Sequence, residues 1–217
     1  MQTSITPRDG LPRVIGLSGK KRHGKDTLGA QLACLGYRRA AFADALYAEV
    51  SDKTGVPLRV LRDPELKDAP LHELGGQSPR AVLQEYGMAR RAADPEYWVR
   101  QVKRLVETAS AQRWVITDVR LPNEAAWVEF CGVLVRVVRP SVGSDDAHIS
   151  ETALDTWPFR YGVVNRDGRP QEMFAELLEQ LQCPAYIVGR SRFRKRTRQQ
   201  GATPLPVARK RERTAYE

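Results

Sequence analysis

Short apolar runs alternate along the chain with longer stretches of helical character. Five runs predict strands, the second with the weakest pattern: 13–17, 38–43, 113–118, 133–138 and 161–164. Six stretches predict helices, from apolar spacing or from start signals such as a serine or aspartate before a proline: 25–35, 45–55, 78–91, 94–110, 122–132 and 170–182. Residues 57–78, rich in proline and glycine, are expected to form loop. This alternation is typical of an α/β fold in which helices cover both faces of a parallel sheet.

The order of these elements places three polar motifs at one edge of the expected sheet. Ligands of open parallel sheets bind in the crevice at the carboxyl ends of the strands. The stretch GKKRHGKDT, residues 19–27, follows the first strand, Asp44 follows the second, and Asp-Val-Arg, residues 118–120, ends the third. We therefore expect the functional site in this crevice.

The first motif has the spacing of a phosphate-binding loop, or P-loop. Gly19 and Gly24 are followed by Lys25, between a strand and a helix. The glycines let backbone N–H groups point at phosphate oxygens, and Lys25 is expected to reach the β- and γ-phosphates. Asp26 replaces the usual serine or threonine, so Thr27 is expected to supply the hydroxyl on the magnesium side. The alternative is a basic turn without a ligand. The basic side chains of residues 20–23 contact either phosphate or solvent.

The third motif holds a carboxylate and an arginine. Asp118 follows the apolar residues 114–117, where P-loop enzymes keep a carboxylate for magnesium or its waters. The alternative role is a helix cap before Pro122. Arg120 is expected to contact a phosphate or to pair with Asp118.

The composition excludes several classes of protein. The 217 residues are 41% hydrophobic and 28% charged, as in ordinary globular domains. No apolar run approaches the roughly 18 residues that span a membrane, and the N-terminus has no secretory signal. Cys34, Cys131 and Cys183 are scattered without metal-ligand spacing, which indicates a reducing compartment. We expect a cytoplasmic protein.

The net charge of +9 belongs mainly to the C-terminal end. Residues 190–217 hold eight arginines and two lysines against two glutamates, so they carry +8 and leave +1 for residues 1–189. Because this segment has little apolar content, we expect a disordered basic tail that makes weak, salt-sensitive contacts with nucleic acid. Residues 1–12 are expected to be an N-terminal extension and residues 13–189 the functional domain.

Several short motifs together resemble the deoxynucleoside monophosphate kinases of bacteriophages, in the adenylate-kinase-like branch of P-loop proteins. They are GKKRHGKDT, AFADAL, SPRAVLQEYG, YWV, ITDVRLPNEA, VLVRVVRP, HISE followed by LD, and VVNRDG. The similarity covers residues 13–182, and its most specific part is the combination of GKDT with DVRLPNEA. Two positions depart from the family pattern: Ala45 replaces a frequent proline, and Glu85-Tyr86 replaces a more apolar pair in the base-binding region.

The resemblance implies a fold, a reaction and a set of roles. The fold is a three-layer P-loop kinase fold with strand order 2-3-1-4-5. The reaction is transfer of the ATP γ-phosphoryl group, with Mg²⁺, to a deoxynucleoside monophosphate in the cytoplasm, the host's if the chain is phage-encoded. Residues 57–112 would be the acceptor-binding helical part, and residues 140–158 a lid-like loop. The implied site residues are Lys25, Asp44 and Arg120 for catalysis; Gly19, Gly24, Lys25, Asp26, Thr27 and Arg139 for the ATP phosphates; Asp44, Arg80, Gln84, Trp98 and Arg120 for the acceptor; and Thr27 and Asp118 for the metal.

The acceptor assignments have structural alternatives. A monophosphate is mostly dianionic at neutral pH, so it needs cations such as Arg80 and Arg120 rather than a strong base. Arg80 could instead pair with Glu85, and Gln84 could be a plain surface amide. Trp98, or its neighbour Tyr97, would stack on a base or belong to the core. His148, Ser150 and Glu151 lie in the long loop and are assigned no chemistry.

Two other functions stay open. A P-loop kinase acting on a hydroxyl, such as the dephospho-coenzyme A kinases, shares the architecture and the N-x-x-G element after the last strand. It would use Asp44 as a general base. A nucleic-acid-binding protein driven by the basic tail would leave the P-loop unexplained. The sequence does not fix the preferred base or the oligomeric state, for which a homodimer is one candidate.

Overall fold

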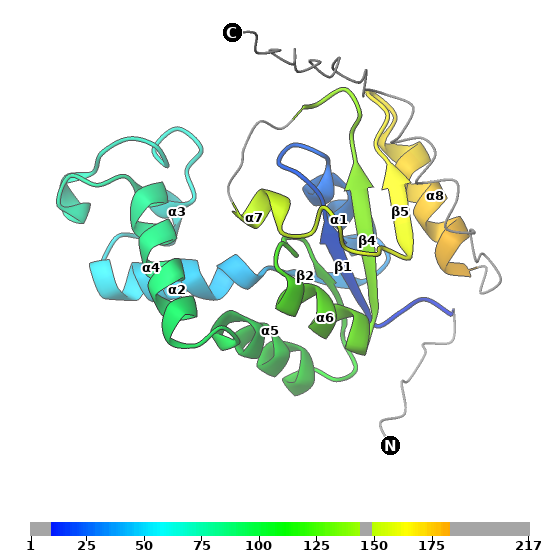
Figure 1. Cartoon of the computed structure of the whole chain (residues 1–217), viewed down its shortest axis with the longest axis horizontal. Helices are drawn as coiled ribbons and strands as arrows, with labels where there is room; N and C mark the ends of the chain where they lie inside the picture. Colours follow the sequence, from blue (N-terminus) through cyan, green and yellow to red (C-terminus); the bar gives the residue numbers. More distant parts are fainter. Residues whose placement is uncertain (1–9, 144–148, 183–217) are drawn as a thin grey trace, which may run out of the picture. The chain divides into compact units, whose positions relative to one another are not determined.

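The computed structural model describes residues 10–143 and 149–182, which form a parallel sheet surrounded by helices (Figure 1). The strands are β1 Val14–Ser18, β2 Tyr37–Ala40, β3 Arg113–Ile116, β4 Val133–Val138 and β5 Tyr161–Val164. The helices are α1 Lys25–Ala33, α2 Phe42–Thr54, α3 Leu58–Leu61, η1 His72–Leu74, α4 Pro79–Ala93, α5 Tyr97–Thr108, α6 Pro122–Cys131, α7 Ile149–Thr152 and α8 Pro170–Gln182. The strand order is β2-β3-β1-β4-β5 with parallel pairing throughout, which confirms the predicted fold and order.

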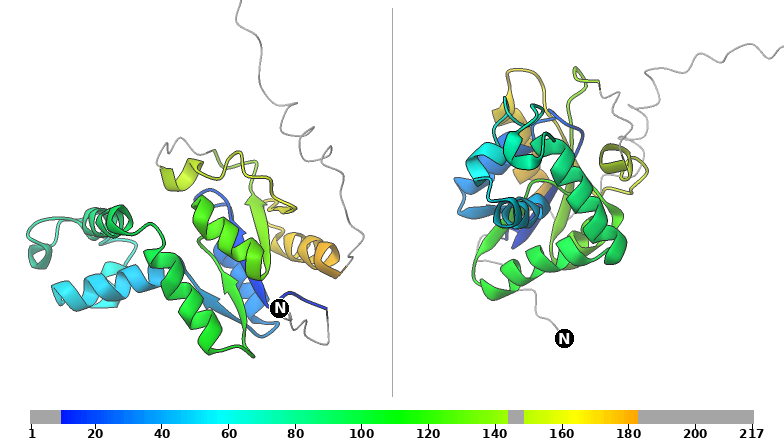
Figure 2. Two further views of the ribbon diagram at one scale, coloured as in Figure 1. Left: turned by 60° about the horizontal axis from the view of Figure 1, so that its bottom comes forward. Right: turned by 90° about the vertical axis from the view of Figure 1, so that its left-hand side faces the viewer.

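Successive strand residues supply two cores, one on each face of the sheet. Ile15 of β1 packs with Leu28 of α1 and Leu177 of α8. Val14, the preceding residue, faces the opposite side and packs with Val128 of α6. All five side chains are fully buried, and burying a side chain of this size contributes about 1.5–3 kcal/mol relative to leaving it exposed. Figure 2 shows the helices on both sides of the sheet.

A third apolar cluster joins α2, α3, η1 and α4 beside the sheet. It is formed by Val50, Val56, Leu61, Leu74 and Leu83. The prediction that residues 57–78 form loop was wrong in part, because α3 and η1 lie within them. The burial of one leucine from each of these short helices supplies the apolar anchor that the proline and glycine pattern concealed.

The second strand is shorter than predicted. β2 ends at Ala40, and α2 begins at Phe42, so residues 42–43 are helical rather than extended. β2 lies at an edge of the sheet and exposes Arg38 and Arg39, which weakens its apolar pattern. β3 also ends two residues before its predicted limit.

Some predictions concern residues outside the described ranges. These are the basic tail at 190–217, residues 1–9 of the N-terminal extension, and residues 144–148 of the lid-like loop, His148 included. Among the helices that the structure describes, none is long and apolar enough to cross a membrane.

Candidate functional site

The loop between β1 and α1 passes so close to its neighbours that both motif glycines are required. Gly19 has φ +147°, and a Cβ there would lie 2.3 Å from the carbonyl oxygen of Val137 in β4. Gly24 precedes α1 with φ +101°, and its Cβ would lie 2.4 Å from Nδ2 of Asn165. A side chain at Gly19 would collide with the backbone of β4, and one at Gly24 would displace the Asn165 side chain and strain the left-handed backbone. The loop leads into the N-terminus of α1, whose unpaired N–H groups favour an anion.

Lys25 is folded back into this loop. Its Nζ donates hydrogen bonds to the carbonyl oxygens of Gly19 at 2.6 Å and Lys20 at 2.8 Å. Burial, followed by the nearby guanidinium of Arg120, lowers the pKa of Lys25 from 10.5 to about 8. Two cations therefore lie within electrostatic reach of each other at the P-loop.

Asp118 is a buried carboxylate that caps a helix. It accepts hydrogen bonds from the backbone N–H groups of Phe42 at 2.8 Å and Ala43 at 2.9 Å. The capped helix is α2, not the helix that starts at Pro122. Burial raises the pKa of Asp118. Each carboxylate oxygen keeps a second lone pair, so a role in binding magnesium or its waters stays a prediction.

Glu124 fixes the backbone that carries Arg120. It is 3% exposed, and its Oε2 accepts hydrogen bonds from the N–H groups of Arg120 at 2.8 Å and Leu121 at 3.1 Å. Burial, followed by the charge of Asp118, raises the pKa of Glu124 from 4.5 to about 7. Ionisation of this buried group near neutral pH therefore opposes folding.

Glu124→Gln is expected to change how stability depends on pH. Between 4.5 and about 7 the folded protein binds more protons at Glu124 than the unfolded chain does, so the wild type loses stability as the pH rises through this window. Glutamine keeps an acceptor oxygen but does not ionise. The melting temperature of the variant, relative to the wild type, should rise between about pH 5 and about pH 8. An equal difference at both pH values in thermal denaturation would contradict this.

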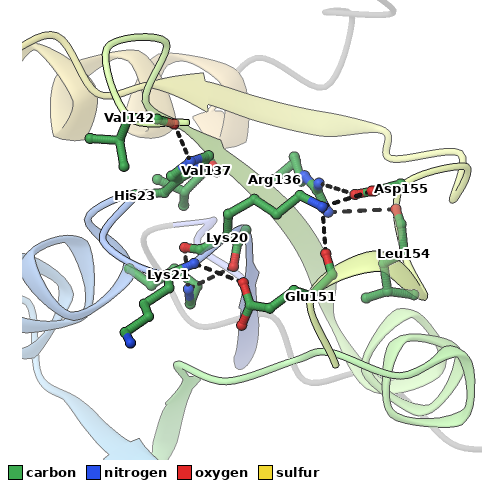
Figure 3. A network of polar contacts seen from close by, with 11 residues as sticks. Lys20, Lys21, His23, Arg136, Val137, Val142, Glu151, Leu154 and Asp155 are labelled. Carbon is green, nitrogen blue, oxygen red and sulfur yellow. Dashed lines mark hydrogen bonds and ion pairs between the residues drawn. The ribbon is translucent and has the colours of Figure 1, made fainter. Parts of the chain in front are cut away.

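Helix α7 brings Glu151 to the P-loop (Figure 3). Its Oε2 accepts a hydrogen bond from the backbone N–H of Lys21 at 2.9 Å, and its Oε1 accepts one from the guanidinium of Arg120. The Glu151 side chain is 4% exposed. Arg120 therefore pairs with Glu151, whereas the sequence left two alternatives, a phosphate contact or a pair with Asp118.

Asp155 ties the same segment to the P-loop and to β4 (Figure 3). One carboxylate oxygen accepts a hydrogen bond from Lys20 Nζ at 2.7 Å, and the other accepts one from Arg136 at 2.9 Å. Lys20 also donates to the carbonyl oxygen of Glu151 at 2.6 Å. Lys20 is thus engaged within the protein and not with solvent.

His23 is enclosed between β4 and the loop that follows it. The residue is 7% exposed, and its ring nitrogens each lie 3.3 Å from a carbonyl oxygen, that of Val137 or that of Val142. Burial lowers the pKa of His23. Asn165 donates to the carbonyl oxygen of His23 at 3.0 Å. These contacts hold the P-loop against β4, the loop after β4, and Asn165. His23 therefore has a structural role in the P-loop.

Asp44 lies in the first turn of α2, which corrects the expectation that it follows a strand. Its Oδ2 accepts a hydrogen bond from the N–H of Ala41 at 2.8 Å, and its Oδ1 accepts one from Arg62 at 2.8 Å. Arg39 lies 3.5 Å from the same carboxylate. Both oxygens of Asp44 therefore already have hydrogen-bonding partners, and a substrate hydroxyl would have to displace one of them.

Arg80 and Gln84 lie in the first half of α4. The Arg80 guanidinium hydrogen-bonds to Asp68, not to Glu85. This hydrogen bond is the main cause of the lowered pKa of Asp68, to which the charge of Lys21 also contributes. Gln84 is exposed one turn further along α4. Both roles at the acceptor stay predictions.

Trp98 does not stack on a base, contrary to one of the predictions. The residue is 1% exposed, its Nε1 donates to the carbonyl oxygen of Gly87 at 3.4 Å, and its ring packs edge-on against Tyr97. Tyr97 is half-buried and donates its hydroxyl proton to Glu49 at 2.6 Å. The structural alternative was correct: Trp98 anchors α5 against α4.

Arg139 directly follows β4 and links the ends of two strands. Its Nε donates to Asp167 at 2.6 Å, beyond the end of β5. The Arg139 side chain is 34% exposed and lies at the carboxyl edge of the sheet, the edge where open parallel sheets generally bind ligands; its role stays a prediction.

The residues that would meet a metal ion offer oxygen ligands. Within residues 10–143 and 149–182, no three histidine, cysteine or acidic side chains cluster closely enough to hold a metal. Mg²⁺ usually keeps several waters and binds one or two carboxylates together with substrate phosphates. Asp26 and Thr27 are exposed in the first turn of α1, and Asp118 follows β3. This set fits Mg²⁺ that is held mainly by nucleotide phosphates.

Sequence reasoning assigned no role to Glu151 or Glu124. The partners of Glu151 lie 130 and 31 residues away in sequence, so no local pattern indicated the contact. Glu124 carried a readable signal, because a glutamate in the first turn, just after Pro122, often reaches back to the N-cap backbone.

One sequence relative among known proteins is named as a kinase. No family model matches the sequence. A protein of Acanthamoeba polyphaga mimivirus, provisionally named a deoxynucleotide monophosphate kinase, is 30% identical over 162 residues, which cover 65% of this chain and 81% of that protein. Two solved structures each align with 79% of this chain and 96% of their own. They are TT1252 from Thermus thermophilus, with TM-score 0.46 and 21% identity, and a dephospho-CoA kinase from Campylobacter jejuni, with TM-score 0.45 and 13% identity.

Proposed function

Because the chain belongs to the P-loop kinase family of this mimivirus relative, we propose that it transfers the γ-phosphoryl group of ATP to a deoxynucleoside monophosphate. The observation that carries the proposal is that Lys25 and Arg120 are both held at the P-loop: Lys25 donates to the carbonyl oxygens of Gly19 and Lys20, and Arg120 pairs with Glu151, which binds the N–H of Lys21. Bringing two phosphates together requires cations of this kind, because the reaction joins two anions.

In the proposed reaction, the P-loop N–H groups hold the ATP phosphates and Lys25 faces the β- and γ-phosphates. Arg120 and Arg80 draw the acceptor phosphate toward the γ-phosphorus, and Arg80 exchanges its exposed partner Asp68 for that phosphate. An oxygen of the acceptor attacks the γ-phosphorus while the bond to the β–γ bridging oxygen breaks. The products are a deoxynucleoside diphosphate and ADP.

The remaining proposed roles concern magnesium and the ATP phosphates. Mg²⁺, when bound with ATP, neutralises phosphate charge, and Thr27 and Asp118 are the side chains proposed to hold it or its waters. Arg139 is proposed to contact the ATP phosphates, because it lies at the carboxyl edge of the sheet beside the P-loop strand.

The contacts of Asp44 favour a phosphate acceptor over a hydroxyl acceptor, because both of its oxygens already accept hydrogen bonds. A hydroxyl must lose a proton during transfer, whereas a monophosphate, with its second pKa near ~6, is already an anion at neutral pH. Asp44 was the candidate base for the hydroxyl reaction, and it is bound by Arg62, Arg39 and the N–H of Ala41.

A coupled ADP-release assay tests the proposal. The four common deoxynucleoside monophosphates, their ribose counterparts and dephospho-coenzyme A are each offered with ATP and Mg²⁺. We expect turnover with at least one deoxynucleoside monophosphate and none with dephospho-coenzyme A. Turnover with dephospho-coenzyme A alone would replace the proposal by the hydroxyl kinase.

ATP binding is expected to take up a proton at about pH 8.5. In the free protein the pKa of Lys25 is about 8, so much of the ammonium has lost its proton at this pH, and a bound polyphosphate restores it. Calorimetric titration in buffers of different ionisation enthalpy measures the uptake. Lys25→Arg is the control, since arginine stays protonated and should abolish the uptake. Equal proton uptake by both proteins would contradict this assignment.

A further inference from the structure

Glu151 is a buried acid in the candidate site that the proposed reaction does not use. Its side chain is 4% exposed, and it joins two elements that are far apart in sequence: the P-loop, through the N–H of Lys21, and the turn after β3, through the guanidinium of Arg120. A buried carboxylate is strongly unfavourable unless it is paired. Here both oxygens are engaged, and each partner belongs to the machinery of transfer.

The segment that carries Glu151 is itself anchored. Asp155, four residues further on, binds Lys20 of the P-loop at 2.7 Å and Arg136 of β4 at 2.9 Å (Figure 3). Lys20 also donates to the Glu151 carbonyl oxygen at 2.6 Å. The main chain at Glu151 is therefore held in place, and its carboxylate acts as a fixed acceptor for Arg120.

Arg120 needs a fixed acceptor to hold the orientation of its guanidinium. Its long side chain has several rotatable bonds, and Glu124 fixes only its backbone N–H. Arg120 and Lys25 are both cations, and the charge of Arg120 is, after burial, the second cause of the lowered pKa of Lys25. Glu151 is the described acid that binds the guanidinium end of Arg120, and it binds the P-loop through its other oxygen.

We propose that Glu151 is a positioning residue, which orients the Arg120 guanidinium against the P-loop for phosphoryl transfer. The inference rests on the proposed function only in that Arg120 contacts a phosphate during transfer. It assigns to α7 a role in catalysis, exercised through Arg120 and not by contact with the nucleotide.

Glu151→Gln is the direct test. Glutamine has one acceptor oxygen instead of two, so it can no longer accept from the N–H of Lys21 and from Arg120 with separate oxygens, and it carries no charge. We expect kcat to fall about 10- to 100-fold, the scale for misplacing a group by about 1 Å, while KM for ATP changes less than about twofold. Glu107→Gln is the control, because Glu107 pairs with Lys103 on the surface of α5 and should leave kcat unchanged.

A double-mutant cycle separates positioning from mere stability. If Glu151 acts through Arg120, then Glu151→Gln should change kcat less than about twofold in an Arg120→Ala background. Additive losses would overturn the proposal, as would a lower KM for ATP with unchanged kcat, which would make Glu151 a competitor of phosphate. Melting temperatures of all four proteins show that each is folded, and Glu151→Asp, which keeps the charge with a shorter reach, serves as a second variant.

The cycle is independent of the identity of the acceptor. It is measured with whichever acceptor the wild type uses, or with water as acceptor if ATP hydrolysis is the reaction observed. Absence of deoxynucleotide turnover by the wild type contradicts the proposed function alone, whereas additivity in the cycle contradicts the role of Glu151 alone.

Discussion

Lys25→Ala is expected to lower kcat by about 10²-fold or more, the scale for removing one preorganised charge from a developing anion. The ammonium is already held at the P-loop by the carbonyl oxygens of Gly19 and Lys20. The fold should survive, because burial of this cation is unfavourable, as its lowered pKa shows, and its loss removes that cost.

Steady-state kinetics and a melting curve measure both parts of this expectation. Lys103→Ala is the matched control, since Lys103 makes a surface pair on α5 with Glu107 at 3.9 Å. Turnover like that of the wild type in Lys25→Ala would contradict the assignment of the loop to phosphate. A large fall in melting temperature would contradict the view that Lys25 serves function at a cost in stability.

Arg120→Ala is expected to have an effect of similar size, about 10²- to 10³-fold in kcat, with KM rising more for the monophosphate than for ATP. The variant also leaves Glu151 buried without its guanidinium partner. The melting temperature should therefore fall, because an uncompensated buried charge is destabilising. Adding Glu151→Gln to this variant should restore stability but not activity.

Two variants make this expectation specific. Arg120→Lys keeps the charge but not the planar fork, so it should retain only part of the activity. Arg100→Ala is the control, because Arg100 is an exposed arginine of α5 paired with Asp94. If KM for ATP rises more than KM for the monophosphate, Arg120 belongs to the ATP side of the site.

Most of the sheet was predictable because its strands other than β2 are short, largely apolar runs. A run such as Val133–Val138 is short, rich in valine and bounded by helical stretches, which predicts a buried strand. The limit between β2 and α2 was not predictable in the same way. It depends on the carboxylate of Asp118, which binds the N–H groups of Phe42 and Ala43 from about 75 residues away in sequence.

The candidate site also contains residues that local sequence predicts and residues that depend on contacts distant in sequence. The glycines and Lys25 lie within seven consecutive residues, and this spacing by itself predicts a phosphate-binding loop. Glu151 depends on contacts across the fold, so only the structure could reveal it. Trp98 was misassigned because an aromatic residue on an amphipathic helix has the same sequence pattern whether it faces a ligand or the core.

Label transfer from ATP tests the central claim most directly. The wild-type protein is incubated with ATP labelled at the γ-phosphorus, Mg²⁺ and a mixture of deoxynucleoside monophosphates, and the labelled products are separated. The account predicts label at the β-phosphate of a deoxynucleoside diphosphate, formed at least about 100-fold more slowly by Lys25→Ala. Label in a phosphate ester on a hydroxyl group, or in inorganic phosphate alone, would contradict it.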